Sequence, residues 1–158
     1  MHKQPKTTHL VVASARINAP AGRVYTTLAD YRNGHPPILP TEFSGMTVER
    51  GGTGQGTIVR FNMRLLGKTQ TYRAAVTEPE PGRVLVEKDL ETNGAVATFT
   101  VNPGPDETKS DVTIVTELPV RGGLVGAIER TVTTRLLRPI YIRELALLAA
   151  QVEPPGVG

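Results

Sequence analysis

Several residue types are missing or scarce in this chain, and each shortage removes a class of function. There is no cysteine among the 158 residues, so disulfides, thiolate metal sites and cysteine nucleophiles are excluded. There is no tryptophan, and with only four tyrosines and three phenylalanines the chain offers few platforms for stacking nucleic-acid bases. The absence of cysteine also suits a reducing compartment, and we expect a cytoplasmic protein.

Long apolar runs and a strong excess of one charge are lacking as well. The run from Leu145 to Ala150 is far shorter than the ~20 residues of a membrane-spanning helix. The polar start, Met1 to Lys6, and the short apolar run that follows do not fit a signal peptide. A net charge of +3 without a clustered basic face does not indicate nucleic-acid binding. We therefore expect no integral membrane segment and no nucleic-acid partner.

Motifs for metals and cofactors are absent too. The three histidines, His2, His9 and His35, have neither paired helical spacing nor neighbouring acidic clusters, so no metal site is predicted. The glycine-rich stretch 51–56 lacks the spacing of a dinucleotide fingerprint, and Gly67-Lys68-Thr69 lacks the upstream glycine of a phosphate-binding loop. We expect no cofactor.

The composition that remains is that of an ordinary globular protein, with 39% apolar and 21% charged residues. No internal repeat or linker divides the chain. We expect a single domain spanning residues 1–158, with an ordered core from about residue 8 to about residue 152. The sequence does not indicate an oligomeric state.

The first forty residues predict a strand and two short helical segments. Thr8 to Ile17 is typical of a strand. Pro20 suits the first position of a helix, in which Val24 and Leu28, four residues apart, form the buried stripe. Asp30 to Pro40 contains adjacent prolines that cannot donate intrahelical hydrogen bonds, which predicts a turn or a broken second helix.

From Phe43 to Leu118, short alternating segments are separated by turn residues. Between Thr57 and Leu65, every second residue is apolar or threonine, and Arg60, Asn62 and Arg64 lie between them, which predicts a strand with one buried face. Asn93-Gly94 is typical of a two-residue type I′ hairpin turn. Successive strands joined by such short turns must be antiparallel neighbours.

After Pro119 the pattern is helical to about Val152. Five apolar residues fall within an arc of about 120° and predict the buried face of its first half: Leu124, Val125, Ile128, Val132 and Leu136. Past Pro139 the apolar positions shift to Tyr141, Leu145, Leu148 and Val152, which we interpret as a proline kink that redirects the buried face.

Together these elements predict an α+β fold, in which a curved antiparallel seven-stranded sheet wraps around a long C-terminal helix and two short helices follow the first strand. One helix about 10 Å wide cannot fill the concavity of such a sheet. The space left between sheet and helix predicts a pocket for an apolar ligand.

Two segments resemble a known superfamily. They are "INAPAGRVYTTLADY" (residues 17–31) and "RGGLVGAIERTVTTRLLRPIYIRELALLAAQVE" (residues 121–153), and the hairpins between them match in number and length. The chain resembles START-like proteins of the SRPBCC superfamily, which have the pollen-allergen-type helix-grip fold, and in particular their polyketide cyclase/dehydrase and lipid-transport branch. The resemblance implies a hydrophobic cavity that binds, carries or modifies lipids, polyketides, quinones or aromatic compounds. Pro36-Pro37 departs from the family pattern where a second short helix is usual.

Eight residues are predicted to line the cavity: Phe61, Met63, Tyr72, Phe99, Val101, Ile128, Val132 and Arg135. Three residues are candidates for catalysis. His35 exchanges a proton near neutral pH, and its alternative is an exposed loop histidine. Tyr72 donates to a carbonyl or is a satisfied core tyrosine. Arg135 binds a carboxylate, phenolate or phosphate, or it extends past the core to solvent. The face taken by Glu87 stays unassigned.

Three functions remain open at this point. The first is a non-catalytic binder or carrier of a hydrophobic small molecule. The second is a polyketide cyclase, aromatase or dehydratase that uses the same cavity, favoured if at least two of the three catalytic candidates are buried in it. The third is an interaction module in which the helix arginines bind an acidic protein surface or anionic lipids.

Overall fold

The computed structural model describes residues 7–154, so His2 and the other residues outside this range are not discussed further. The elements in chain order are β1 (Thr7–Ile17), α1 (Ala21–Ala29), a 3-10 turn η1 (Pro36–Ile38), β2 (Phe43–Arg50), β3 (Ile58–Leu65), β4 (Lys68–Glu80), β5 (Val84–Asp89), β6 (Val96–Pro103), β7 (Ser110–Val120) and α2 (Gly123–Val152). No helix within this range is long and apolar enough to cross a membrane.

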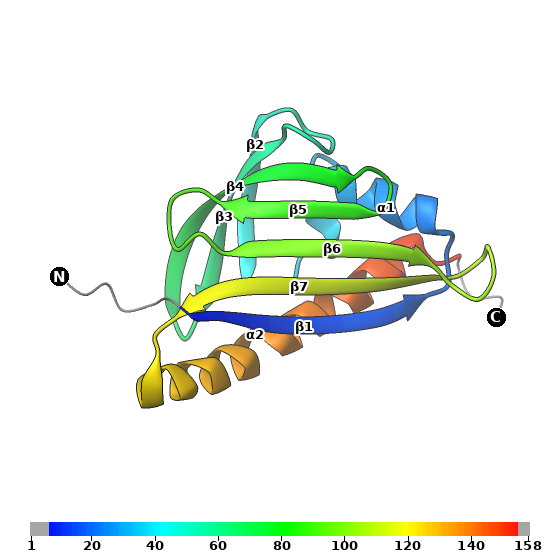
Figure 1. Cartoon of the computed structure of the whole chain (residues 1–158). Helices are drawn as coiled ribbons and strands as arrows, with labels where there is room; N and C mark the ends of the chain where they lie inside the picture. The colour runs from blue at the N-terminus through cyan, green and yellow to red at the C-terminus, as the bar shows by residue number, and fades with distance from the viewer. Residues whose placement is uncertain (1–6, 155–158) are drawn as a thin grey trace.

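The seven strands form one antiparallel sheet in the order β1-β7-β6-β5-β4-β3-β2. Figure 1 shows the sheet curling around α2, which runs diagonally across its concave face, while α1 lies near one end of the sheet. A curved sheet with one face against a long helix is the predicted helix-grip arrangement, and the prediction of the fold class is confirmed.

Strand β1 shows how the period-two pattern places the core. It pairs with β7 in continuous register from Thr7 opposite Val120 to Ile17 opposite Ser110. Val11, Ala13 and Ile17 are buried against the core, whereas their neighbours Leu10 and Val12 face solvent. Successive side chains of a strand point to opposite faces, so this alternation sets which face of the sheet is covered.

The segment after β1 contains the two predicted short helices in modified form. Helix α1 begins at Ala21, one residue after Pro20, and buries Val24 and Leu28. The adjacent prolines occupy the first positions of η1, where their missing N–H groups have no intrahelical partner to lose. The second helix is therefore only one 3-10 turn, which contacts α2.

Helix α2 is continuous through Pro139, and one face of it turns inward along its length. Tyr141, Leu145, Leu148 and Val152 are buried as predicted. The predicted apolar arc of the first half is wrong for four of its five residues: Leu124, Val125, Ile128 and Val132 are exposed, and Leu124 is 80% exposed. The fifth, Leu136, is half-buried and lines the pocket described below. The buried second half fixes which side faces the sheet. At 100° per residue, that side of the first half carries Gly126, Glu129 and Thr133 instead of the apolar arc.

The connection between β5 and β6 also differs from its prediction. The strands end at Asp89 and resume at Val96, so the loop is longer than a two-residue type I′ turn. The carboxylate of Asp89 accepts hydrogen bonds from the backbone N–H groups of residues 91–94, which holds the loop closed. These bonds lower the pKa of Asp89 although burial acts to raise it. Asp89, the last residue of β5, therefore organises this loop. The Asn-Gly pair contributes the hydrogen bond that Asn93 Oδ1 accepts from the N–H of Ala95 and the positive φ of Gly94.

Candidate functional site

A pocket of about 410 Å³ lies between the concave face of the sheet and α2, within the size range of small-molecule sites. The two residues that flank η1, His35 and Leu39, and residues of strands β2 to β7 form its walls together with part of α2. Most of the lining side chains are apolar or aromatic, and four residues predicted for the cavity are among them: Phe61, Met63, Tyr72 and Phe99.

Aromatic rings cover the wall built by β2, β3 and β4. Phe61 and Tyr72 are directly opposite in the β3–β4 register and stack with ring centroids 5.6 Å apart. Phe43 lies tilted against Phe61, with centroids 5.8 Å apart. Burial and the nearby charge of Asp89 raise the pKa of Tyr72, so its hydroxyl stays a hydrogen-bond donor at neutral pH.

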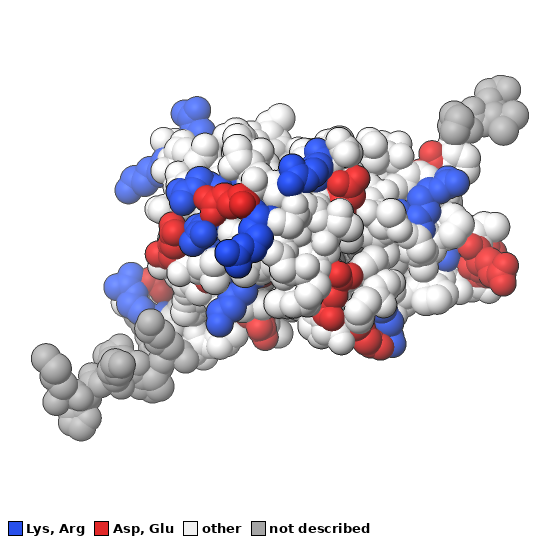
Figure 2. Space-filling view, turned by 90° about the horizontal axis from the view of Figure 1, so that it is seen from above, with Lys and Arg blue, Asp and Glu red and all other residues white. Residues whose placement is uncertain are grey.

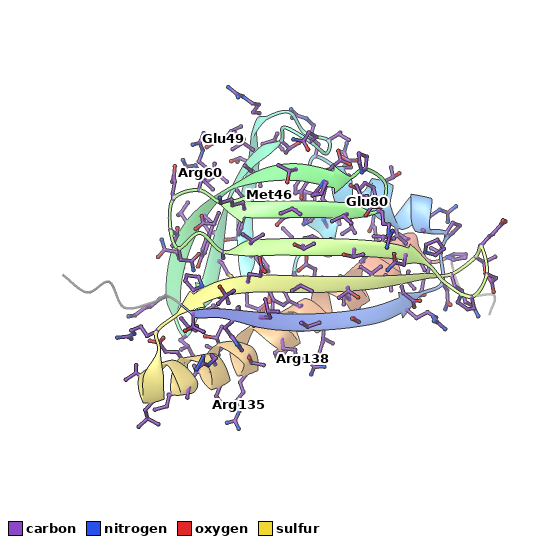
Figure 3. The ribbon with its side chains drawn as sticks, viewed as in Figure 1. Met46, Glu49, Arg60, Glu80, Arg135 and Arg138 are labelled. Carbon is purple, nitrogen blue, oxygen red and sulfur yellow. The ribbon has the colours of Figure 1, made fainter. Side chains whose placement is uncertain are left out.

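Four predicted cavity residues do not line the pocket. Val101 is buried in the core beyond Phe99 on β6, the strand that contacts α1. Ile128, Val132 and Arg135 lie on the outer side of α2 for the reason given above, and all three are exposed. Figure 3 shows Arg135 pointing away from the sheet, so the prediction that Arg135 lines the cavity is wrong. Arg138 instead reaches the outer strand β1, where its Nε donates to the carbonyl oxygen of Val12 at 3.3 Å.

His35 is placed by the chain between α1 and η1. The backbone carbonyl of Asp30 accepts hydrogen bonds from the N–H groups of Gly34 and His35, which turns the chain back toward α1. The side chain of Asp30 caps the same turn by accepting from the N–H groups of Arg32 and Asn33. A side chain at Gly34 would collide with the backbone of Thr27, so only glycine permits this close approach.

The ring of His35 is buried, with 2% of the residue exposed, so the alternative of a solvent-exposed loop histidine is wrong. Its ring stacks on Tyr31 at 4.6 Å and meets Phe99 edge-on at 5.8 Å between ring centroids. Nδ1 lies 2.8 Å from the carbonyl oxygen of Leu28. Because a carbonyl can only accept, Nδ1 carries the proton of this bond, and Nε2 is the nitrogen that faces the pocket.

Two carboxyl groups approach Nε2 of His35. Glu87 Oε1 lies 3.6 Å from it and Glu144 Oε1 3.8 Å from it. Glu87 also accepts a hydrogen bond of 2.6 Å from the hydroxyl of Tyr31. Glu144 is 4% exposed, and its burial, reinforced by the charge of Glu87, raises its pKa well above the usual range. We call His35, Glu87 and Glu144 the polar cluster; all three residues line the pocket.

The polar cluster can store and transfer protons inside an apolar cavity. A neutral imidazole with its proton on Nδ1 leaves a lone pair on Nε2, which accepts a proton from a neighbouring carboxyl or from a ligand. Tyr141 also lines the pocket, and burial raises its pKa to about 12, which keeps its hydroxyl protonated. Acid, base and donor groups are thus gathered on one cavity.

Glu87 and Glu144 were not among the predicted site residues. The structure turns Glu87 toward the pocket, which answers the open question of its face. Glu144 carried a usable signal: at 100° per residue it lies between Leu137 and Tyr141 on one side and Ile140 on the other, inside the apolar arc of α2. A single carboxylate within a buried stripe is expensive unless it is paired or protonated, and so it marks a site.

Elsewhere, charged groups are dispersed or paired. Between residues 7 and 154 no group of three or more histidine or acidic side chains is arranged to hold a metal ion, and His9 contacts the hydroxyl of Thr134 at 2.7 Å. Figure 2 shows basic and acidic side chains interleaved on the face seen from above. Glu49, for example, pairs with Arg60 and Arg73 at 2.9 and 2.6 Å.

Solved structures with this fold cover nearly the whole chain. The KanY protein (ms6282) is 28% identical, with 92% of this chain and 97% of that chain aligned at a TM-score of 0.76. The Zhui aromatase/cyclase from Streptomyces sp. R1128 is 18% identical over 91% and 93% of the two chains, with a TM-score of 0.70. A START superfamily protein from Mycobacterium smegmatis is 16% identical over 91% and 97%, with a TM-score of 0.69.

Comparison with curated proteins gives no significant match. The family described as polyketide cyclase/dehydrase and lipid transport matches residues 8–153, which includes both segments that carry the START-like resemblance and all strands between them. The chain therefore belongs to the polyketide cyclase/dehydrase and lipid transport family.

Proposed function

We propose that this protein binds a hydrophobic small molecule in the pocket between the sheet and α2. The observation that carries the proposal is the pocket itself, about 410 Å³ of space whose walls are mostly apolar and aromatic side chains. A cavity of this kind lowers the free energy of an apolar ligand by removing its surface from water. The family to which the chain belongs, described by cyclisation, dehydration and lipid transport, agrees with such a role.

Binding of the neutral dye Nile red, together with native mass spectrometry of the purified protein, tests this proposal. Phe61→Glu places a charge among the rings of Phe43 and Tyr72, and we expect it to weaken dye binding at least about tenfold because a carboxylate is costly to bury. The matched control is Ile128→Glu, which makes the same charge change on the outer side of α2. Equal dye affinity in a folded Phe61→Glu variant and the control would contradict the proposal.

A second candidate function is an enzyme of the cyclase, aromatase or dehydratase type. Two of the three predicted catalytic residues, His35 and Tyr72, line one pocket, and the polar cluster adds two carboxyl groups there. In this hypothesis Nε2 of His35 removes a proton next to a ligand carbonyl, and a tyrosine hydroxyl stabilises the resulting enolate.

Proton exchange reports on this hypothesis without a known substrate. A bound apolar ketone such as 2-tetralone, followed by NMR in heavy water, should exchange its α-protons faster than in buffer. His35→Asn keeps a donor for the carbonyl of Leu28 but removes Nε2, and it should abolish the acceleration. A ketone that binds and exchanges at the buffer rate would leave only the binding function.

The third hypothesis, an interaction module, stays a prediction. Its requirement is that the α2 arginines be exposed, and Arg135 and Arg138 are exposed beside apolar residues on the outer side of the helix. Binding to anionic vesicles that weakens as salt is added would support it, since exposed charges are screened within about 8 Å at physiological ionic strength.

A further inference from the structure

The charged side chains that line the pocket all have the same sign. They are Glu87, Asp89, Glu129 and Glu144, and no lysine or arginine among residues 7–154 joins them. None of the arginines of α2 is among the residues that line the pocket, although Arg130 is half-buried on the inward side of the helix. The pocket walls are mostly apolar and carry four acidic side chains. How each acidic group interacts with a ligand depends on whether another part of the protein already donates hydrogen bonds to it.

Two of the four acidic groups have partners of their own. Asp89 accepts backbone N–H bonds from the loop that follows β5, as described above. Glu129 lies on the first turns of α2 and pairs with the guanidinium of Arg121, whose Nε is 2.7 Å from Glu129 Oε1. Because protein groups already donate to these two carboxylates, few of their oxygen lone pairs remain to accept a hydrogen bond from a ligand.

Glu87 and Glu144 differ from that pair, because within residues 7–154 neither an arginine, a lysine nor a backbone N–H group pairs with their carboxyl groups. Glu87 has the Tyr31 hydroxyl and His35 as neighbours, and both carboxyl groups converge on the same imidazole nitrogen. No hydrogen bond joins the carboxyl of Glu144 to another residue in the described part of the chain, although it is 4% exposed and borders the pocket. A buried carboxyl without a hydrogen-bond partner is an unfilled position for a donor.

A ligand that carries a negative charge would meet these groups without a compensating cation. Like charges a few ångströms apart in a poorly solvated cavity repel strongly, and the ligand anion would also lose its hydration. An ammonium or hydroxyl group would instead donate to Glu144, Glu87 or Nε2 of His35.

We propose that the pocket selects apolar ligands whose buried polar group is an amine or hydroxyl that donates hydrogen bonds, and that it excludes ligands ending in a carboxylate. This inference rests on the proposed binding function and adds a rule of selection to it. It also replaces the sequence-based expectation that an arginine would hold a ligand carboxylate.

Three probes that share one apolar body separate the possibilities: 2-(2-naphthyl)ethylamine, 2-(2-naphthyl)ethanol and 2-naphthylacetate, each titrated against protein-bound Nile red at neutral pH. We expect the amine and the alcohol to displace the dye at concentrations at least about tenfold below the carboxylate, since placing like charges side by side costs several kcal/mol. The carboxylate should gain affinity at acidic pH, where it enters in its protonated form.

Two matched variants locate the effect. Glu144→Gln keeps the shape of the side chain and removes its acidic group, so the difference between the displacing concentrations of the amine and the carboxylate should narrow. Glu117→Gln makes the same substitution at an exposed position of β7 outside the pocket. The difference between the displacing concentrations of the amine and the carboxylate should be the same as in the parent protein.

The failure of this rule is distinguishable from the failure of the binding function. If Nile red binds but the carboxylate displaces it as well as the amine does, or if no probe displaces it, the selection rule is overturned and the binding function stands. If Nile red does not bind at all, the binding function fails and the selection rule fails with it.

Discussion

Both halves of α2 carry large apolar side chains, but the surroundings of these side chains differ. In residues 137–152, the side chains of Leu137, Ile140, Leu145 and Leu148 are buried in the core. In residues 123–136, Leu124, Val125, Ile128 and Val132 face solvent, while polar Glu129 and Thr133 border the pocket. In Figure 1 the first turns of the helix lie beyond β1, at the edge of the sheet. The second half therefore anchors the fold and also contributes Tyr141 and Glu144 to the pocket wall, whereas the first half is anchored by few buried apolar side chains.

The largest expected effect comes from removing an anchor residue in the second half. Leu145→Ala should lower the free energy of unfolding by about 2–5 kcal/mol, because the leucine is fully buried and its loss leaves a cavity. Urea denaturation followed by circular dichroism measures the change. A loss below about 0.5 kcal/mol, the range of ordinary surface substitutions, would mean that this half does not anchor the fold.

A pair of glycines tests how tightly the first half is joined to the sheet. A side chain at Gly126 would overlap the backbone carbonyl of Arg121 in the β7–α2 connection, so Gly126→Ala should destabilise the protein by about 1–3 kcal/mol through overpacking.

Gly22 in α1 is the control, since a methyl group there meets no atom within 4 Å. Gly22→Ala should stabilise the protein by about 0.5–1 kcal/mol, the usual gain of replacing glycine in a helix. Thermal unfolding of both variants gives the comparison. If both substitutions stabilised the protein, the backbone around Arg121 would be able to move away from a side chain at position 126, and the expected overpacking would be contradicted.

The carboxyl groups of the two halves should respond to pH with opposite signs. The pKa of Glu144 is raised in the folded protein by its burial and by Glu87, so folding stability is lost as pH rises above the usual glutamate value of 4.5. Glu144→Gln lacks this loss, and its melting temperature should exceed that of the parent protein by a margin that grows with pH.

Glu129 has its pKa lowered by the hydrogen bond from Arg121, so its contribution is present above the usual value and is lost as pH falls. Glu129→Gln should therefore melt below the parent protein at neutral pH and should approach it in acid. Melting curves from about pH 4 to about pH 8 measure both variants. If the melting temperatures of Glu144→Gln and the parent protein changed in parallel with pH, the raised pKa of Glu144 would be contradicted.

The smallest effect is expected on the outer side of the first half. Leu124→Gln should change the free energy of unfolding by no more than about 0.5 kcal/mol, because Leu124 is 80% exposed and glutamine is a good helix former. A loss comparable to that of Leu145→Ala would show that another surface covers this side in solution.

The sheet was predictable because its signals are local. Alternation between Thr57 and Leu65 fixes a buried face whatever lies opposite, and the structure places Val59 and Met63 on that face. The orientation of α2 was not predictable in the same way. Its first half carries an apolar arc, and only the tertiary anchoring of residues such as Leu145 and Leu148 decides that this arc faces outward.

The site was predicted in part for the same reason. Tyr72 and Phe61 followed from strand alternation, and His35 followed from its chemistry next to the proline pair. The convergence of Glu87 and Glu144 on His35 brings together β5, α2 and the segment before η1, and no local pattern encodes that meeting. The positions of Ile128, Val132 and Arg135 depended on the orientation of α2 and were wrong with it.

The pairing of β1 with β7 has a consequence for how the chain reaches this structure. Strand β1, residues 7–17, lies at the edge of the sheet and pairs with residues 110–120 of β7. The hairpins from β2 to β7 join neighbours along the chain and close short loops, whereas the β1–β7 ladder closes a very long one, and such contacts slow folding. On the ribosome, β1 must wait until most of the chain has emerged, and the pocket cannot exist before α2 follows. A ligand therefore meets a binding site only at the last step of folding, and its binding will show itself as slower unfolding of the finished protein.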